Sequence, residues 1–213
     1  MQLSTDSLLN FRHLIFTSLI LMASPSFAYL TLHDTGEILP QGHYSLGAEP
    51  QIVTSGNTGL NLGVFIDAPL NDAAQARISM GAGVTDFWVS AAVKYIPFPD
   101  VDNQPAIGFR GALSYGRDEN LNMFSISLTP LVSKKTQIRH GELIPYVGLP
   151  ITHTSHKEKS FVSSQFAIGS EFTSYELKDY VFGGEVAFNL NQSFSYISAY
   201  IKFPFEASQG YKR

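Results

Sequence analysis

The sequence predicts an all-β fold, an antiparallel transmembrane β-barrel of about ten strands, with eight to twelve left open. Three observations predict it. Apolar residues alternate with small or polar ones in segment after segment, which is the period of a strand with two unlike faces. The segments are about 9–12 residues long, enough for a tilted strand to cross a hydrocarbon core. The bulky face is nearly free of charge and carries aromatic residues at its ends.

The composition excludes several classes of protein. The chain has 213 residues, of which 44% are hydrophobic and 15% charged, with a net charge of −4. A nucleic-acid binder usually carries a basic excess, which is missing here. The absence of cysteine excludes a disulfide scaffold, a thiolate metal site and a cysteine nucleophile. The 17 glycines and 16 phenylalanines argue against a disordered chain.

Residues 1–28 have the three-part pattern of a secretory signal peptide. Arg12 precedes a short apolar run, and small residues, Ser26 and Ala28, occupy the −3 and −1 places of a cleavage site. The run is too short for a membrane-spanning helix, and no later apolar run is long enough. We therefore expect export, with cleavage after Ala28.

The expected strands follow one another from residue 42. Residues 29–41 form a polar N-terminal segment, 42–205 the barrel domain, and 206–213 a C-terminal tail. Gly, Pro, Asn and Asp bound the alternating segments, and none of them keeps a helical period. The expected strands cover about residues 43–54, 59–67, 75–83, 86–97, 107–115, 124–132, 143–151, 162–172, 180–188 and 197–205.

Each segment has one bulky and one small or polar face. In residues 59–67, for example, Leu60, Leu62 and Val64 oppose Asn61 and Asp67. Strands with such a bulky face can lie in lipid only if the sheet closes, because every backbone edge must be paired there. We expect longer connections at about residues 98–104, 131–142 and 152–162, and an interfacial anchoring role for the single tryptophan at position 88.

The segment FSYISAYIKFPF, residues 194–205, alternates apolar residues and ends in an aromatic residue. It resembles the closing strand of the outer-membrane β-barrel proteins of Gram-negative bacteria. The run GHYSLGAEP, residues 42–50, is similar to the first strand of small barrels of unassigned function. The resemblance implies a transmembrane barrel in the outer membrane, with outer-membrane lipid and, through its last strand, the barrel-assembly machinery as partners.

The alternation places seven charged side chains on the inner face of the barrel. As a lumen charge network they could form a constriction that selects solutes, or they could pair and fill a narrow lumen. These residues are Asp67, Arg77, Lys94, Arg110, Glu171, Glu185 and Lys202.

A second candidate site is the histidine-rich stretch around residues 153–158. His153 and His156 have a spacing that could bind metal with His140, although a solvated loop explains them as well. His153, Ser155 and Glu158 are also the only local cluster of types used by lipid-modifying barrels, but no nucleophile elbow accompanies them. We therefore assign no catalytic residue, no metal and no cofactor.

The sequence favours a non-enzymatic, porin-like outer-membrane barrel with a structural role or a narrow pore. One alternative is an outer-membrane lipid-modifying enzyme with a histidine-based site near the barrel rim. The other is a soluble periplasmic β-barrel that holds an apolar ligand, which would require the bulky faces to point inward.

Overall fold

The computed structural model describes residues 31–207 except 57, 119–120 and 157–158. The predicted signal peptide, its cleavage site and most of the predicted tail lie outside the described residues. The strands are β1 His43–Val53, β2 Gly59–Asn71, β3 Ala74–Gly83, β4 Phe87–Phe98, β5 Ala106–Asp118, β6 Leu121–Ser133, β7 Thr136–Ile138, β8 Gly141–Gly148, β9 Ile151–His156, β10 Lys159–Ser174, β11 Val181–Asn191 and β12 Tyr196–Glu206. Within the described residues, no helix has the length and apolar character needed to span a membrane.

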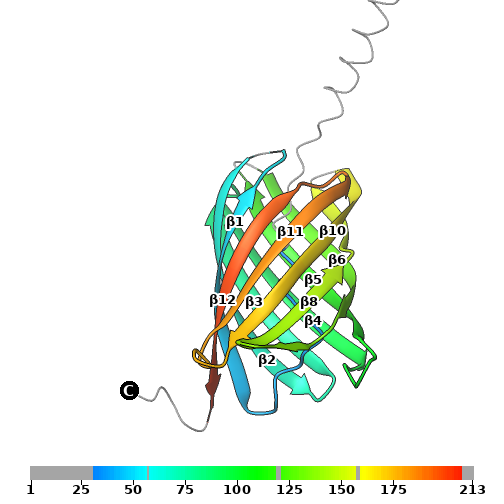
Figure 1. Cartoon of the computed structure of the whole chain (residues 1–213). Coiled ribbons are helices and arrows are strands. Elements are labelled where there is room, and N and C mark those ends of the chain that lie inside the picture. Colours follow the sequence, from blue (N-terminus) through cyan, green and yellow to red (C-terminus); the bar gives the residue numbers. More distant parts are fainter. Residues whose placement is uncertain (1–30, 57, 119–120, 157–158, 208–213) are drawn as a thin grey trace, which may run out of the picture.

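The strands close into an antiparallel barrel of ten positions (Figure 1). From β1 to β6 and from β9 to β12 each strand pairs with the next one in sequence, and β1 closes the ring by pairing with β12. β8 and β9 share one position between β6 and β10, because Pro150 interrupts the strand that they would otherwise form. β7 pairs with β8 alone and is not one of the ten positions of the ring. The predicted fold class is confirmed.

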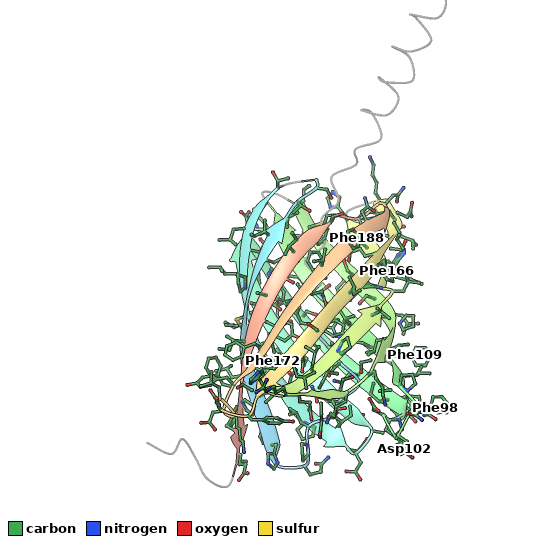
Figure 2. The ribbon with its side chains drawn as sticks, viewed as in Figure 1. Phe98, Asp102, Phe109, Phe166, Phe172 and Phe188 are labelled. Carbon is green, nitrogen blue, oxygen red and sulfur yellow. The ribbon has the colours of Figure 1, made fainter. Side chains whose placement is uncertain are left out.

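The bulky faces point outward. In β6, Phe124, Ile126 and Leu128 are 47%, 51% and 55% exposed, whereas Ser125 and Ser127 between them are buried. Figure 2 shows the same outward direction for labelled phenylalanines on four other strands. Water-soluble monomers rarely expose apolar surface on this scale. The soluble barrel around an apolar ligand is therefore wrong, because its bulky residues would have to line the interior.

Two of the expected long connections are mostly strand. Residues 151–156 pair with β6 on one side and with β10 on the other, and β10 begins at Lys159. Residues 131–142 contain the end of β6, all of β7 and the start of β8. The inward residues of β9 are Thr152 and Thr154, and its outward face continues after Ile151 with the polar His153 and Ser155, so the sequence shows little alternation there. Backbone pairing with both neighbours decides the structure there.

The expectation that Trp88 anchors the barrel at a membrane interface is wrong. Trp88 points into the lumen, is buried, and lies directly opposite Gly81 on the neighbouring strand. A side chain on Gly81 would collide with the indole. An inward aromatic ring covers a glycine of the paired strand in the same way at Phe65 over Gly47, Tyr146 over Gly169 and Tyr200 over Gly183. These pairings fit large rings into a narrow barrel.

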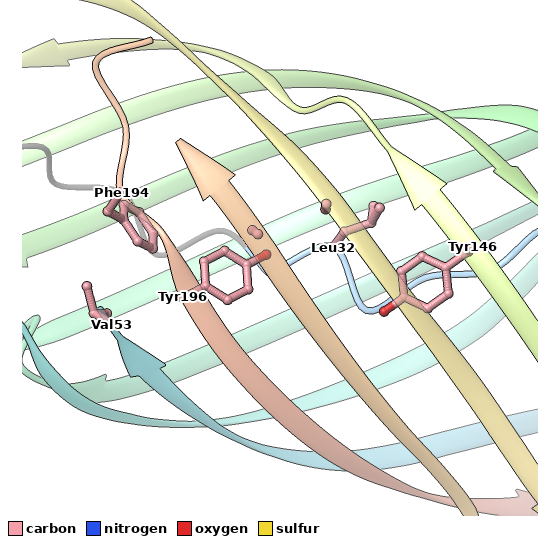
Figure 3. Close-up of a cluster of buried hydrophobic side chains, with 7 residues drawn as sticks. Leu32, Val53, Tyr146, Phe194 and Tyr196 are labelled. Atoms are coloured by element: carbon pink, nitrogen blue, oxygen red, sulfur yellow. The ribbon is translucent and has the colours of Figure 1, made fainter. Parts of the chain in front are cut away.

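The polar N-terminal segment does not lie outside the barrel but runs through it. Leu32 belongs to a buried apolar cluster with Tyr146, Tyr196, Phe194 and Val53, and Figure 3 shows it between Tyr196 and Tyr146. Seven residues later, the Leu39 amide donates to Gln75 near the end of the barrel where β3 begins. The segment then turns into β1. Residues 31–39, which we call the lumen segment, therefore fill the interior from the level of Glu49 and Glu185 to that of Gln75.

Candidate functional site

The structure places all seven sequence-predicted charged residues inside the barrel. Each is almost fully buried, and each comes from a different strand. They are Asp67 on β2, Arg77 on β3, Lys94 on β4, Arg110 on β5, Glu171 on β10, Glu185 on β11 and Lys202 on β12. Buried charges are costly unless they are paired, so their partners define what this site can do.

Two pairs join neighbouring or nearby strands. Asp67 and Arg77 face each other in the β2–β3 register and form a two-point contact, with Nε–Oδ1 at 2.6 Å and Nη2–Oδ2 at 2.9 Å. Lys202 donates to Glu171, which also accepts a hydrogen bond from Tyr200 at 3.1 Å. Both pairs are held within the barrel wall and satisfy their own charges.

A carboxylate of the lumen segment lies between the other two cations. Lys94 Nζ lies 2.7 Å from Asp34 Oδ1, and Arg110 Nε lies 3.5 Å from Asp34 Oδ2. The ammonium of Lys94 also donates to the carbonyls of Thr35 at 2.8 Å and Glu37 at 2.6 Å. Lys94 thus binds the lumen segment through three oxygen atoms, and Asp34 is shared between two cations from neighbouring strands.

Glu185 holds the lumen segment by its backbone. Its carboxylate accepts hydrogen bonds from the amides of Leu32 and His33, both at 2.9 Å. It also accepts from the hydroxyls of Tyr146 at 2.8 Å and Tyr196 at 2.5 Å. Four donors therefore surround one buried carboxylate, which compensates its desolvation without a cation in direct contact.

His33 connects the lumen segment to two further wall residues. Its Nδ1 contacts the carboxylate of Glu49, and its Nε2 lies 2.5 Å from Ser198 Oγ. The ring also lies against Tyr200, with centroids 4.4 Å apart. This acid–histidine–serine order has the connectivity of a nucleophile triad. His33 is fully buried, however, and the described contacts leave it packed between wall residues, as a structural anchor would be.

A small cavity lies beside these contacts. Its volume is about 10 Å³, the room needed by one water molecule. We call it the Arg110 cavity. Its lining residues are Thr31, Glu49, Phe65, Arg77, Ser79, Trp88, Ser90 and Arg110.

The histidine-rich stretch does not form a second site in the described residues. His153 and Ser155 lie on the outward face of β9 and are exposed, and Glu158 lies outside the described residues. His140 is in the turn before β8, where its carbonyl accepts from the Tyr175 amide. The described residues contain no group of three histidine or acidic side chains that could hold a metal ion.

Sequence reasoning missed the lumen segment and its residues His33 and Asp34. Segment 29–41 shows no alternation, so nothing in its pattern predicts a place inside a barrel. The alternation of the first strand also places Glu49 on the inward face, where the residue is buried, and Glu49 was missed as well. With Glu49, the inward face of the wall carries four cations and four carboxylates, so counting charges does not reveal the acid of the lumen segment. Asp34 is the buried acid that lies between two of those cations.

No protein-family model matches the chain, and no curated protein matches it. Solved structures show likeness of fold at low identity. The N-terminal β-barrel domain of Pseudomonas aeruginosa OprF is 14% identical, covering 78% of this chain and 98% of that one, with a TM-score of 0.36. The translocator domain of the autotransporter NalP from Neisseria meningitidis is 11% identical; the match covers 94% of this chain and 98% of that one, with a TM-score of 0.46. An outer membrane channel from Pseudomonas putida F1 is 8% identical; the match covers 83% of this chain and 100% of that one, and its TM-score is also 0.46.

The chain's own geometry establishes its class. In the described residues the ring closes through the pairing of β1 with β12, the exterior is apolar, and the interior is polar and charged. The chain therefore has the fold of an outer-membrane β-barrel.

Proposed function

We propose that the chain is a non-enzymatic outer-membrane barrel with a structural role, whose lumen is closed by its own residues 31–39. The contact of Asp34 with Lys94 and Arg110 carries this proposal, because it fastens the lumen segment to the wall at buried charges. The alternative of a narrow open pore would need the same cations to face water.

Opening the lumen would require several buried contacts to break together. Asp34 would leave Lys94, and His33 would leave Glu49, so four charged or polar groups would lose their partners. Removing one partner of a buried ion pair costs about 3–5 kcal/mol. Even the lower figure corresponds to an open population below about 1%.

The proposal includes the path to the membrane. Residues 1–28 act as a signal peptide that is removed after Ala28, and β12 presents its terminal aromatic residues to the assembly machinery. Phe203 and Phe205 are exposed on the outer face of β12, and the Phe205 ring stacks on Tyr44 of β1 with centroids 5.7 Å apart. Lipid would cover this aromatic rim.

Catalysis is not part of the proposal. The site predicted around His153 would need its side chains to converge, and His153 instead points outward. The row from Glu49 through His33 to Ser198 supports anchoring, because it ties the lumen segment to β1 and β12 at once. No cofactor and no nucleic acid enter the proposal.

Conductance in planar bilayers tests the proposed function. The refolded mature chain should show no steady conductance, whereas Asp34→Asn should open ion-conducting events because Lys94 and Arg110 lose their shared carboxylate. Asp100→Asn is the matched control, since this carboxylate lies in the connection between β4 and β5 and pairs with Lys134 outside the lumen. A steady conductance of the unmodified chain would refute the closed barrel and favour the narrow pore.

A further inference from the structure

The inner wall of the barrel holds the lumen segment largely by its backbone. The carboxylate of Glu185 accepts hydrogen bonds from two successive amides, those of Leu32 and His33. Arg77 Nη1 donates to the carbonyls of the same two residues, at 3.4 and 3.0 Å. Two wall side chains therefore bind four backbone groups of a two-residue stretch.

The same kind of contact continues along the segment toward β1. Every extended chain carries amides and carbonyls, so contacts with these groups do not depend on the side chains of the bound segment. The remaining contacts with the backbone, at 2.6 to 3.0 Å, are those of Lys94 Nζ with the carbonyls of Thr35 and Glu37, of Ser133 Oγ with the Gly36 amide, and of Gln75 Oε1 with the Leu39 amide.

Alternate residues of the lumen segment add selectivity. Leu32 lies in one buried apolar cluster, and Ile38 packs against a second cluster formed by β4, β5 and β6. Between them, Asp34 lies beside two buried cations. A Cβ on Gly36 would lie 2.2 Å from the Cβ of Ala106, so only glycine fits there. The wall thus selects an apolar residue, an aspartate, a glycine and a second apolar residue at every second position.

We propose that the inner wall is a binding site for an extended peptide of the pattern apolar–x–Asp–x–Gly–x–apolar, and that the lumen segment is the occupant that the chain itself supplies. The side chain of His33 adds contacts with Glu49 and Ser198. A peptide of another chain with this pattern would make the same contacts and compete with the lumen segment. The inference rests on the proposed closure of the lumen and adds to it the class of ligand that the wall takes.

A cut in the turn before β1 makes the occupant exchangeable. Pro40, Gln41 and Gly42 are exposed, so a protease recognition sequence inserted after Gln41 can be cleaved in the folded mature barrel. The cut barrel is unfolded in urea and refolded into detergent with an excess of a synthetic peptide of residues 29–41, labelled with a fluorophore at its C-terminus. Gel filtration separates bound from free peptide, and the uncut chain measures non-specific uptake.

The cut barrel should retain a stoichiometric amount of the labelled peptide, and the uncut chain should retain none. A peptide of the reversed sequence has the same composition and charge but presents the aspartate and the glycine in the wrong order, so it should not be retained. No uptake by the cut barrel, or equal uptake of the reversed peptide, would overturn the proposal. If the cut barrel does not refold, prolonged incubation of the folded cut barrel with both peptides decides by the same outcomes. A steady conductance of the intact chain would instead contradict the closed lumen, so the two failures are distinguishable.

Unlabelled peptides with single changes locate the selectivity by competition. Asp34→Asn should weaken competition at least about tenfold, because it removes the charge that faces the two cations. Gly36→Ala should weaken it about tenfold through overlap with the wall. Glu37→Gln is the matched control: it removes a carboxylate that pairs with the partly exposed Lys135, and should change competition by less than about fivefold. Equal competition by the Asp34→Asn and Glu37→Gln peptides would contradict the assigned pattern.

Discussion

Lys94 on β4 donates a hydrogen bond to Asp34 of the lumen segment across 2.7 Å, and both side chains are buried. The two residues are 60 positions apart in the chain. Their contact joins the barrel wall to the segment that closes it, so stability and closure depend on the same pair.

The pair should show a strong energetic coupling. Asp34→Asn and Lys94→Met should each lower the free energy of unfolding by about 3–5 kcal/mol, because each leaves a buried charge without its partner. The double variant should lose less than the sum by about 0.5–3 kcal/mol. Urea unfolding in lipid vesicles, followed by gel mobility with and without boiling, measures all four proteins. Strict additivity would show that the two side chains do not interact in the folded barrel.

Trp88 should be shielded from lipid. Because it points into the lumen, lipids brominated on their acyl chains should leave its fluorescence unchanged. The matched control moves the indole by one residue to the outward face, in the double variant Phe87→Trp with Trp88→Phe. Phe87 is 44% exposed, so this variant should be quenched strongly. Equal quenching of both proteins would place Trp88 at the lipid surface after all.

The inward face of Trp88 illustrates how far the sequence predicts this structure. The alternation placed Trp88 on the same face as Lys94, and that face is the lumen. Only the general preference of tryptophan for membrane interfaces argued otherwise. Gly81 on the neighbouring strand leaves room for the indole inside the barrel. Gly81 can be matched with Trp88 only when the register of the two strands is known.

The lumen segment could not be predicted in the same way. Strand periodicity identifies residues that belong to a sheet, and the lumen segment pairs with no strand. Its place is fixed by single long-range contacts, such as those of His33 with Glu49 and of Leu32 with Glu185. The alternating strands of the wall were therefore predictable, apart from β7, β9 and the ends of β8 and β10, whereas the place of the lumen segment was not.

Gly183 should not tolerate a side chain. A Cβ at this position would overlap the ring of Tyr200, whose hydroxyl donates to Glu171. Gly183→Ala should therefore destabilise the barrel by about 1–3 kcal/mol. Gly111→Ala is the control, since no other atom lies within 4 Å of a Cβ built there. Comparable urea midpoints for the two variants would contradict the close packing of Tyr200 on Gly183.

Asp100 should make the stability depend on pH in acid. Burial alone would raise the pKa of its carboxyl, but hydrogen bonds from Lys134 Nζ at 2.5 Å and from the Lys135 amide at 2.6 Å hold the pKa below its usual 3.8. The ionised form is thus favoured in the folded state. Its stabilising contribution is present above pH 3.8 and is lost as the pH falls through the lower folded-state pKa.

The variant Asp100→Asn tests this dependence. It should be less stable than the unmodified chain at neutral pH by about 1 kcal/mol or less, because Lys134 is partly exposed. The difference should disappear in strong acid. Asp72→Asn, an exposed carboxylate in the turn between β2 and β3, controls for the removal of a charge. Urea midpoints at several pH values provide the comparison. If the difference in stability between Asp100→Asn and the unmodified chain grew in acid, the pKa of Asp100 would be raised in the folded state and not lowered.

Labelling of the lumen segment tests the closed barrel most directly. The chain contains no cysteine, so Thr35→Cys introduces a single thiol at a buried position of that segment. A membrane-impermeant maleimide should label this thiol only after the folded barrel is boiled. Gln41→Cys, at an exposed position just before β1, should be labelled at once. If the thiol at position 35 reacts as fast as the thiol at position 41 in the folded protein, the lumen segment does not close this barrel.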